Sequence, residues 1–279
     1  MLEIPEANVI SNQINQYLKG KKIIDVIPNK NPHKLCWFSG EPEEYKQKLM
    51  GKKIKKSNQT GGMIEITVDD HKLVFGDGVQ LLWTDKKEEI PKKHQLLLQL
   101  DDDSFFVAKV QMYGGIWAFK EGEWENEYYE IAKKKPSPLS NKFDFDYFKG
   151  LIKIFKKKSA KAFLATEQRI PGLGNGVLQD ILFNANIHPK TKIDVLTEED
   201  IYELYKSVKN TLAEMVDNGG RDTERDLLGN RGGYKTKMSK NTVGKPCPKC
   251  DSEIKKASYM GGSIYYCEKC QLIKNTENE

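Results

Sequence analysis

The chain has 279 residues, of which 38% are hydrophobic and 30% charged, and its formal net charge is +5. This length allows two domains with a core each, and the modest positive charge is compatible with a polyanionic partner without requiring one. No apolar run reaches the roughly 18 residues of a membrane span, and no charged-then-apolar leader opens the chain. We therefore expect a cytoplasmic protein without a membrane anchor.

The first part of the chain is predicted to be one helix followed by strands. Residues 7–19 carry apolar side chains on one helical face, and Gly20 ends the pattern. Short runs rich in β-branched or aromatic residues follow, separated by polar and glycine-containing turns. The expected strands are residues 23–27, 63–68, 72–75, 80–83, 96–100 and 104–108. Many short strands at this spacing are typical of a sandwich or a barrel.

The composition changes at Lys133–Pro138, a polar segment broken by prolines that cannot continue a helix. Helical patterns dominate beyond it. The expected helices are residues 144–155, 160–167, a segment after Asn175, and 198–216. Thr197 is the predicted N-cap of the last helix, and Asp200 three residues later completes an approximate capping box. The second part of the chain should therefore be mainly α-helical.

The segment Arg169–Asn175 is predicted to be a functional turn. Gly172 and Gly174 follow Pro171, so the backbone can take positive φ values and lie close to another molecule. The turn leads into a helix, whose unpaired N–H groups and dipole favour an anion such as a phosphate. Asn175 stands at this entry, where its side chain would either cap the helix or hold a phosphate oxygen.

Four of the five cysteines form two Cys-x-x-Cys pairs, Cys247/Cys250 and Cys267/Cys270, with sixteen residues between the pairs. Four thiolates at two hairpin corners are the tetrahedral set that zinc prefers. The pattern predicts one structural zinc ion with no open position for water; two disulfides are the alternative. The fifth cysteine, Cys36, is predicted to be a buried small hydrophobe, because no motif surrounds it.

Several segments together carry a resemblance to a known family. They are Met1–Glu6, Pro138–Ser140 with Phe143, Pro171–Asn175, Leu182–Phe183, Ile187–Pro189, Asn218–Gly220, Gly233–Tyr234 and the two cysteine pairs. The chain resembles the formamidopyrimidine-DNA glycosylase and endonuclease VIII family, which combines a helix–two-turn–helix element with a C-terminal zinc finger. The match is specific in the second half of the chain and weak in the first.

The resemblance implies an α+β fold. Residues 1–130 would form an N-terminal two-layer β-sandwich with one helix, and residues 131–140 a linker. Residues 141–236 would form the helical helix–two-turn–helix domain that binds DNA, and residues 240–279 a β-hairpin zinc finger. The implied partner is double-stranded DNA, damaged or abasic, bound by a monomer that in a prokaryote associates with the nucleoid.

The resemblance also implies a covalent chemistry at the N-terminus. In the family, an N-terminal proline amine attacks the sugar C1′ of a damaged nucleotide and forms a Schiff base, and a neighbouring glutamate moves protons. Here Glu3 and Glu6 stand at the acidic positions, but Leu2 stands at the proline position. A primary amine also performs Schiff-base chemistry. If Met1 is retained, the Leu2 nitrogen is an inert amide and the Met1 amine, displaced by one residue, is the candidate nucleophile.

The family's DNA-contacting positions are altered in this sequence. The turn that carries a lysine in the family reads Thr60–Met63 here, and the arginine of the finger aligns with Gly262. Two places correspond to the residues that fill the void left by a flipped base. One is Asp77, which would repel phosphate, and the other is the pair Met112–Tyr113, which could wedge between bases. The residues expected to contact DNA are Met112, Tyr113, Gly174, Asn175 and Gly262.

Three interpretations follow from these residues. The first is a base-excision repair enzyme, a DNA glycosylase and abasic-site lyase, with Met1 or Leu2 supplying the amine and Glu3 transferring protons. The second is a catalytically altered relative that binds damaged or bent DNA without cutting it. The third is a zinc-bound helical protein with no DNA role. The enzyme is the leading hypothesis because Glu3 and Glu6 are kept at the family's positions, which a binding module would not need.

Overall fold

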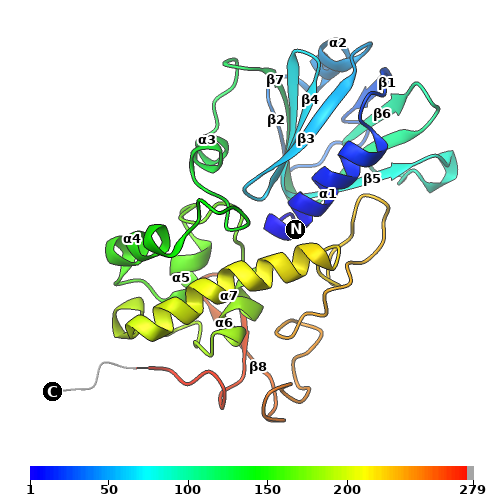
Figure 1. The fold of residues 1–279 in the computed structure, drawn as a ribbon. Coiled ribbons are helices and arrows are strands. Elements are labelled where there is room, and N and C mark those ends of the chain that lie inside the picture. Colours follow the sequence, from blue (N-terminus) through cyan, green and yellow to red (C-terminus); the bar gives the residue numbers. More distant parts are fainter. Residues whose placement is uncertain (275–279) are drawn as a thin grey trace.

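The protein, described here over residues 1–274 of a computed structural model, has two lobes with α3 between them (Figure 1). The first lobe holds a helix, a sheet and a short second helix. Its elements are α1 (Ile4–Tyr17), β1 (Ile23–Pro28), β2 (Cys36–Phe38), α2 (Tyr45–Leu49), β3 (Ile54–Thr60), β4 (Met63–Val68), β5 (His71–Thr84), β6 (Leu96–Leu100) and β7 (Phe105–Lys120).

The strands of the first lobe form one sheet in the order β1-β6-β7-β5-β4-β3, and all the pairs along this path are antiparallel. The short strand β2 lies off this path and pairs parallel with β7. Strands β5 and β7 are 14 and 16 residues long and run through both halves of the sheet. A bulge between Asp77 and Val79 interrupts their pairing. Apolar residues of both halves share one core, as expected for two packed layers.

Two predictions for this lobe were wrong in detail. The first helix begins at Ile4 rather than residue 7, because Pro5 is well tolerated in the first turn of a helix. The runs predicted as separate strands at 72–75 and 80–83 belong to the single strand β5, which continues through the Gly-Asp-Gly sequence as a bulge. Strand β3 was not predicted, since its polar residues lack a β-branched run.

The second lobe is helical, as predicted. Its elements are α3 (Glu127–Lys134), α4 (Phe145–Phe155), α5 (Ala160–Ala165), α6 (Val177–Asn184) and α7 (Glu198–Asp217). The capping box of Thr197 and Asp200 at the start of α7 is confirmed. Helix α3 was not predicted; its N-cap is Asn126, whose side chain accepts a hydrogen bond from the Tyr129 N–H. A separate apolar core joins α4, α5, α6 and α7.

The loop 218–238 connects the two lobes. Its Leu227 is fully buried in the core of the first lobe, and the Leu227 carbonyl accepts a hydrogen bond of 2.8 Å from the Trp83 N–H of β5. Gln13 of α1 donates to Asp226 and accepts from the Leu227 N–H. Helix α1 also packs on α7. The lobes are therefore held together by buried contacts as well as by the connecting chain.

The chain ends in a small finger built on a hairpin of β8 (Lys255–Tyr259) and β9 (Gly262–Tyr266). The turn residues Met260 and Gly261 both have positive φ, which suits a two-residue hairpin loop. Residues 275–279 of the predicted finger lie outside the described residues. Within the described part of the chain, every helix is too short or too polar to cross a bilayer.

Candidate active site and metal centre

A cavity of about 680 Å³ lies where the two lobes meet. Its walls come from the N-terminus, from the sheet and from the loop before α6. The lining residues include Met1, Leu2, Glu3, Trp37, Asp77, Tyr113, Trp117, Tyr128 and Gly174. The predicted catalytic segment and the predicted turn, 170 residues apart in the chain, thus form one site.

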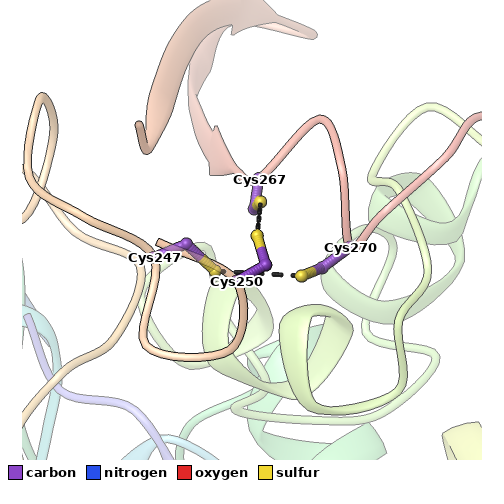
Figure 2. Close-up of side chains that lie close together, drawn as sticks. All are labelled: Cys247, Cys250, Cys267 and Cys270. Atoms are coloured by element: carbon purple, nitrogen blue, oxygen red, sulfur yellow. Dashed lines mark hydrogen bonds between the residues drawn. The ribbon is translucent and has the colours of Figure 1, made fainter. Parts of the chain in front are cut away.

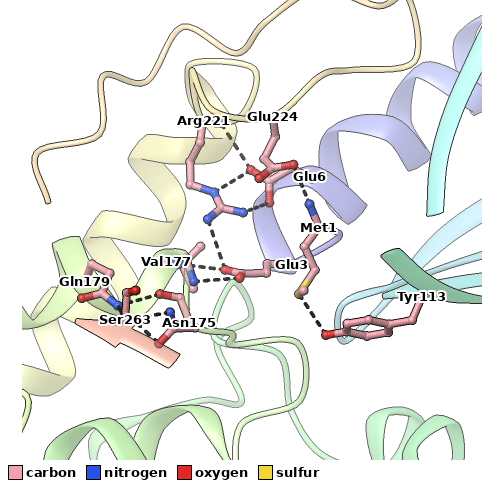
Figure 3. Close-up of polar contacts among 11 residues, drawn as sticks. Met1, Glu3, Glu6, Tyr113, Asn175, Val177, Gln179, Arg221, Glu224 and Ser263 are labelled. Carbon is pink, nitrogen blue, oxygen red and sulfur yellow. Dashed lines mark hydrogen bonds and ion pairs between the residues drawn. The ribbon is translucent and has the colours of Figure 1, made fainter. Parts of the chain in front are cut away.

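The N-terminal residue lines this cavity, and its amine is paired with an acid of the loop 218–238. The Met1 nitrogen is 2.6 Å from Glu224 Oε2, and the Met1 side chain is half-exposed, with its sulfur 3.9 Å from the Tyr113 hydroxyl (Figure 3). The nitrogen of Leu2 is an amide that donates to the Asp77 carbonyl at 2.7 Å. Met1 therefore carries the only amine among the described residues that line the cavity.

Glu3 occupies the N-terminus of α6. One carboxylate oxygen accepts from the Gly176 N–H at 2.8 Å and the other from the Val177 N–H at 2.7 Å (Figure 3). The expected anion at this helix end is thus a carboxylate of the chain itself, and the phosphate expected there was wrong. Burial raises the pKa of Glu3, whereas the charge of Arg221 and the two N–H groups act to lower it.

Glycines in the turn before α6 make room for this arrangement. A Cβ atom on Gly174 would lie 2.5 Å from a Glu3 oxygen, and one on Gly176 would lie 1.9 Å from Arg221 Nη1. Gly172 has a φ of +79°, and a Cβ there would lie 2.1 Å from the backbone nitrogen of Gly62. The glycines are needed so that the first lobe can dock on the turn.

Arg221 is a site residue that the sequence reasoning missed. Its side chain is 3% exposed and binds Glu6 through two hydrogen bonds of 2.9 and 2.7 Å, while Nη1 lies 3.4 Å from a Glu3 oxygen (Figure 3). Glu6 is therefore held inside the protein rather than presented to the cavity. The signal available in the sequence was the pair of acids among apolar residues at the start of the chain, since buried carboxylates require a cation.

Asn175 contacts the finger rather than the helix end. Its amide donates to the Ser263 carbonyl at 3.1 Å, and Gln179 Nε2 donates to the same oxygen at 3.2 Å. The N-cap of α6 is Gly176, so the prediction that Asn175 caps the helix was wrong. Asn175 is exposed, so its predicted contact with phosphate stays a prediction.

The predicted DNA-contacting residues fall into two groups. Gly262 lies beside Asn175, and a Cβ on Gly262 would be 3.3 Å from Lys161 Nζ. Tyr113 lines the cavity, and the neighbouring Met112 is 68% exposed. Asp77 has a positive φ of 58° at the β-bulge, and burial raises the pKa of its carboxyl group.

The four finger cysteines form one cluster, with all sulfur atoms within 4.8 Å of one another (Figure 2). The Cys247–Cys270 and Cys250–Cys267 sulfur separations are 3.8 and 3.4 Å, and all four thiols are free. A disulfide requires about 2.05 Å, so the two-disulfide alternative does not fit. A tetrahedral metal with bonds near 2.3 Å places its sulfurs about 3.8 Å apart, so the residues fit a metal ion.

Cys36, the remaining cysteine, was predicted to be buried and is partly buried. It packs against the core of the first lobe, and burial raises the pKa of its thiol to about 12. A thiol with so high a pKa is not a nucleophile at neutral pH.

Comparison with known proteins agrees with this architecture. Residues 1–146 match the formamidopyrimidine-DNA glycosylase N-terminal domain, and residues 135–226 match the H2TH domain of the same enzymes. The formamidopyrimidine-DNA glycosylase of Bacillus subtilis (strain 168) is 28% identical, over 98% of this chain and 100% of its own length. That of Bacillus licheniformis is also 28% identical, over 97% of this chain and 99% of its own length.

Solved structures share the fold over nearly the whole chain. The MutM (Fpg) protein of Thermus thermophilus superposes with a TM-score of 0.80 at 22% identity, covering 98% of this chain and 100% of that one. Lactococcus lactis Fpg in complex with DNA that contains an abasic site gives 0.82 at 23% identity, covering 97% and 99%. The N-terminal domain model matches more than half of this chain. The chain therefore belongs to the formamidopyrimidine-DNA glycosylase family.

Proposed function

We propose that this protein is a base-excision repair enzyme, a DNA N-glycosylase with abasic-site lyase activity that acts on damaged double-stranded DNA. One observation carries the proposal: Met1, which bears the N-terminal amine, and Glu3 both line one cavity between the two lobes. The curated relatives are named as glycosylases, and the Lactococcus lactis protein was solved bound to abasic-site DNA.

In this proposal the Met1 amine is the nucleophile. Its nitrogen attacks C1′ of the target nucleotide, the glycosidic bond breaks and the base departs. The nitrogen then loses a proton, the C1′–O4′ bond breaks with a proton going to O4′, and a C=N bond forms, which is the Schiff base. Loss of a proton from C2′ with departure of the 3′ phosphate cuts the strand. Glu224, 2.6 Å from the amine, holds the ammonium group before the reaction and is placed to accept its proton.

Glu3 is the proposed proton-transfer residue. It lines the cavity, and its carboxylate, held by the Gly176 and Val177 N–H groups, would take up a proton and pass it to the departing base. Glu6 and Arg221 are assigned a positioning role. Glu6 holds the Arg221 guanidinium group by hydrogen bonds, and that group pairs with the Glu3 carboxylate. Asn175 and Gly174 at the turn, Met112 and Tyr113 at the cavity, and Gly262 in the finger are the proposed DNA-contacting residues.

We further propose that the finger metal is one structural zinc ion. Four thiolates and no water are the ligand set of a closed zinc site. Lys249 supports the finger, since its amine donates to the Phe183 carbonyl at 2.9 Å and to Asn186 at 2.6 Å, at the end of α6. The metal would hold the hairpin against α6 and beside Asn175.

The domain division proposed from the sequence is kept, with α3 lying across the boundary drawn at residue 130. A cytoplasmic location, with nucleoid association in a prokaryote, is proposed because the DNA partner and the reduced thiols of the finger both require it.

The alternative function, DNA binding without cutting, is favoured by one observation. The nitrogen at the family's proline position is the Leu2 amide, which is hydrogen-bonded to Asp77 and cannot attack a sugar. An incision assay separates the two functions. A labelled duplex with one abasic site is incubated with the protein, and the products are resolved by denaturing electrophoresis.

We expect a nick at the abasic site and none in the matched intact duplex. The Glu3→Gln variant should slow base removal more than it slows cutting of the preformed abasic site, because general acid catalysis contributes about 10²–10⁴-fold to proton transfer. An uncut abasic duplex under conditions of saturated binding would establish the non-cutting function instead.

A further inference from the structure

The cavity between the lobes has aromatic and acidic walls. Trp37, Tyr113, Trp117 and Tyr128 contribute rings, and Glu3, Asp77 and Glu167 contribute carboxyl groups. Among the described residues that line it there is no lysine or arginine. Such a cavity repels a phosphate and suits a flat, neutral molecule with N–H donors.

Trp37 stands out among these rings because it comes from a strand that the sequence did not predict. Strand β2 pairs parallel with β7, and Trp37 lies opposite Gly115. The Trp37 side chain is 47% exposed, and its ring centre is 6.1 Å from that of Tyr113 with an angle of 53° between the planes. Leu35 and Met112, which are close to Trp37 and Tyr113 in the chain, also have exposed side chains.

The other three tryptophans are engaged in internal packing. Trp83 stacks on Tyr17 at 5.1 Å, and Trp117 and Trp124 pack on each other at 5.0 Å. Trp37 has Tyr113 as its one ring neighbour in the described part of the chain. A large aromatic side chain left half-exposed at a cavity of a DNA-binding protein is a platform for base stacking.

One of the positions expected to fill the void in DNA cannot do so here. It is occupied by Asp77, a short acid held in a left-handed turn at the bulge of β5. Its carboxyl group has no apolar surface to place between bases. Asp77 pairs with Gly114 across the sheet, and Tyr113, the residue before Gly114, lines the same cavity as Trp37.

We propose that Trp37 stacks on the nucleobase that leaves the DNA helix and enters this cavity, with Tyr113 bordering the same base. This inference rests on the proposed function, because it requires the protein to bind DNA with a base turned out. The acids of the cavity wall would accept hydrogen bonds from the N–H groups of the base. Trp37 is therefore assigned as a residue that holds the everted base in the cavity.

The test compares two duplexes that differ only in whether a base is present to stack. One carries 2-aminopurine in a mismatch, and the other carries a tetrahydrofuran abasic analogue at the same position. Affinity is measured at fixed salt for the natural protein and for the Trp37→Leu and Trp37→Phe variants. Leucine keeps an apolar side chain without a ring, and phenylalanine keeps a ring.

We expect Trp37→Leu to bind the 2-aminopurine duplex about tenfold more weakly, within the range known for base–aromatic stacking, and to bind the abasic duplex unchanged. Trp37→Phe should lie close to the natural protein on both. An equal loss on both duplexes, or no loss on either, would overturn the stacking assignment while leaving the proposed function intact. If the natural protein bound neither duplex more tightly than intact DNA, the proposed function itself would fail, and the stacking assignment with it.

Discussion

The position of the N-terminal acids depends on the buried guanidinium group of Arg221. It pairs with Glu6 and Glu3, and all three side chains are at most 5% exposed. Burial lowers the pKa of Arg221, but the two carboxylates raise it by more, so the group stays charged. A buried charge of this kind is costly once its partner is removed.

Replacing Arg221 with methionine should therefore lower the free energy of unfolding by about 3–5 kcal/mol, because Glu6 and Glu3 would be left buried without a cation. The double variant Arg221→Met, Glu6→Leu should recover a substantial part of this loss. Urea unfolding of the single and double variants measures both values. A loss below about 1 kcal/mol in the single variant would contradict the role assigned to Arg221.

Asn175 and Gln179 offer a matched pair at the finger, because both side chains donate to the Ser263 carbonyl. Asn175 is exposed and Gln179 is buried. We expect Asn175→Ala to weaken duplex affinity about tenfold and equally across sequences, since a phosphate contact positions DNA without reading bases. The melting temperature of Asn175→Ala should stay unchanged, whereas that of Gln179→Ala should be lower.

Fluorescence anisotropy at several salt concentrations gives the affinities, and the Asn175→Ala variant should also show a shallower salt dependence. Unchanged affinity in this variant would mean that Asn175 serves only to dock the finger.

At the scale of elements, the segment after α6 ties the helical lobe to the finger through His188. Its ring packs edge-on against Tyr266 at 4.5 Å, and its Nδ1 accepts from the Lys190 N–H. Burial, and then the charge of Lys190, lower the pKa of His188 to about 4 from the ordinary 6.5. The folded state thus holds the neutral ring.

This pKa predicts how stability depends on pH. Between about pH 6.5 and 4 the unfolded chain binds a proton that the folded chain does not, so the free energy of unfolding should fall as the pH drops through this window. Above pH 6.5 the contribution is fully present. Urea unfolding of the natural protein and of His188→Phe, which keeps the ring contact, measures the difference in slope. Equal slopes would contradict the buried neutral histidine.

The elements that could be predicted are those whose secondary structure is determined by their own residues. Helix α7 has a capping box and an apolar stripe, and β4 has a β-branched run. Strands β2 and β3 and helix α3 could not be predicted, because β2 is three residues long and β3 is polar and gains its structure from pairing with β4. Tertiary contacts decide such segments.

For the whole molecule, the metal cluster could be predicted from the spacing of its cysteines, and the N-terminal acids only from the family resemblance. Glu3 and Glu6 and the four cysteines were found from their positions, and the structure gathers the cysteines as expected. The cation that pairs with the two acids, Arg221, and the acid that pairs with the Met1 amine, Glu224, could not be predicted, since both lie more than 210 residues away in the chain. The cavity itself exists only once the two lobes meet.

The finger should depend on its metal, whereas the first lobe should not. Cys267→Ser removes one of four ligands, so we expect loss of bound zinc and faster hydrogen exchange in β8 and β9. Exchange in β4 and β5 should stay slow, because the first lobe has its own core. Metal analysis and hydrogen exchange measure this. Reduced, freshly purified natural protein without bound metal would contradict the assignment.

The central claim is that an N-terminal amine performs covalent chemistry on DNA, and trapping with borohydride tests it most directly. Borohydride reduces a Schiff base to a stable amine, so incubation with an abasic-site duplex should yield a covalent protein–DNA adduct. Peptide mass analysis should locate the adduct on the Met1 α-amine and report whether Met1 is retained. An adduct on an internal lysine would contradict the assigned nucleophile, and tight binding of the same duplex without any adduct would contradict the enzyme.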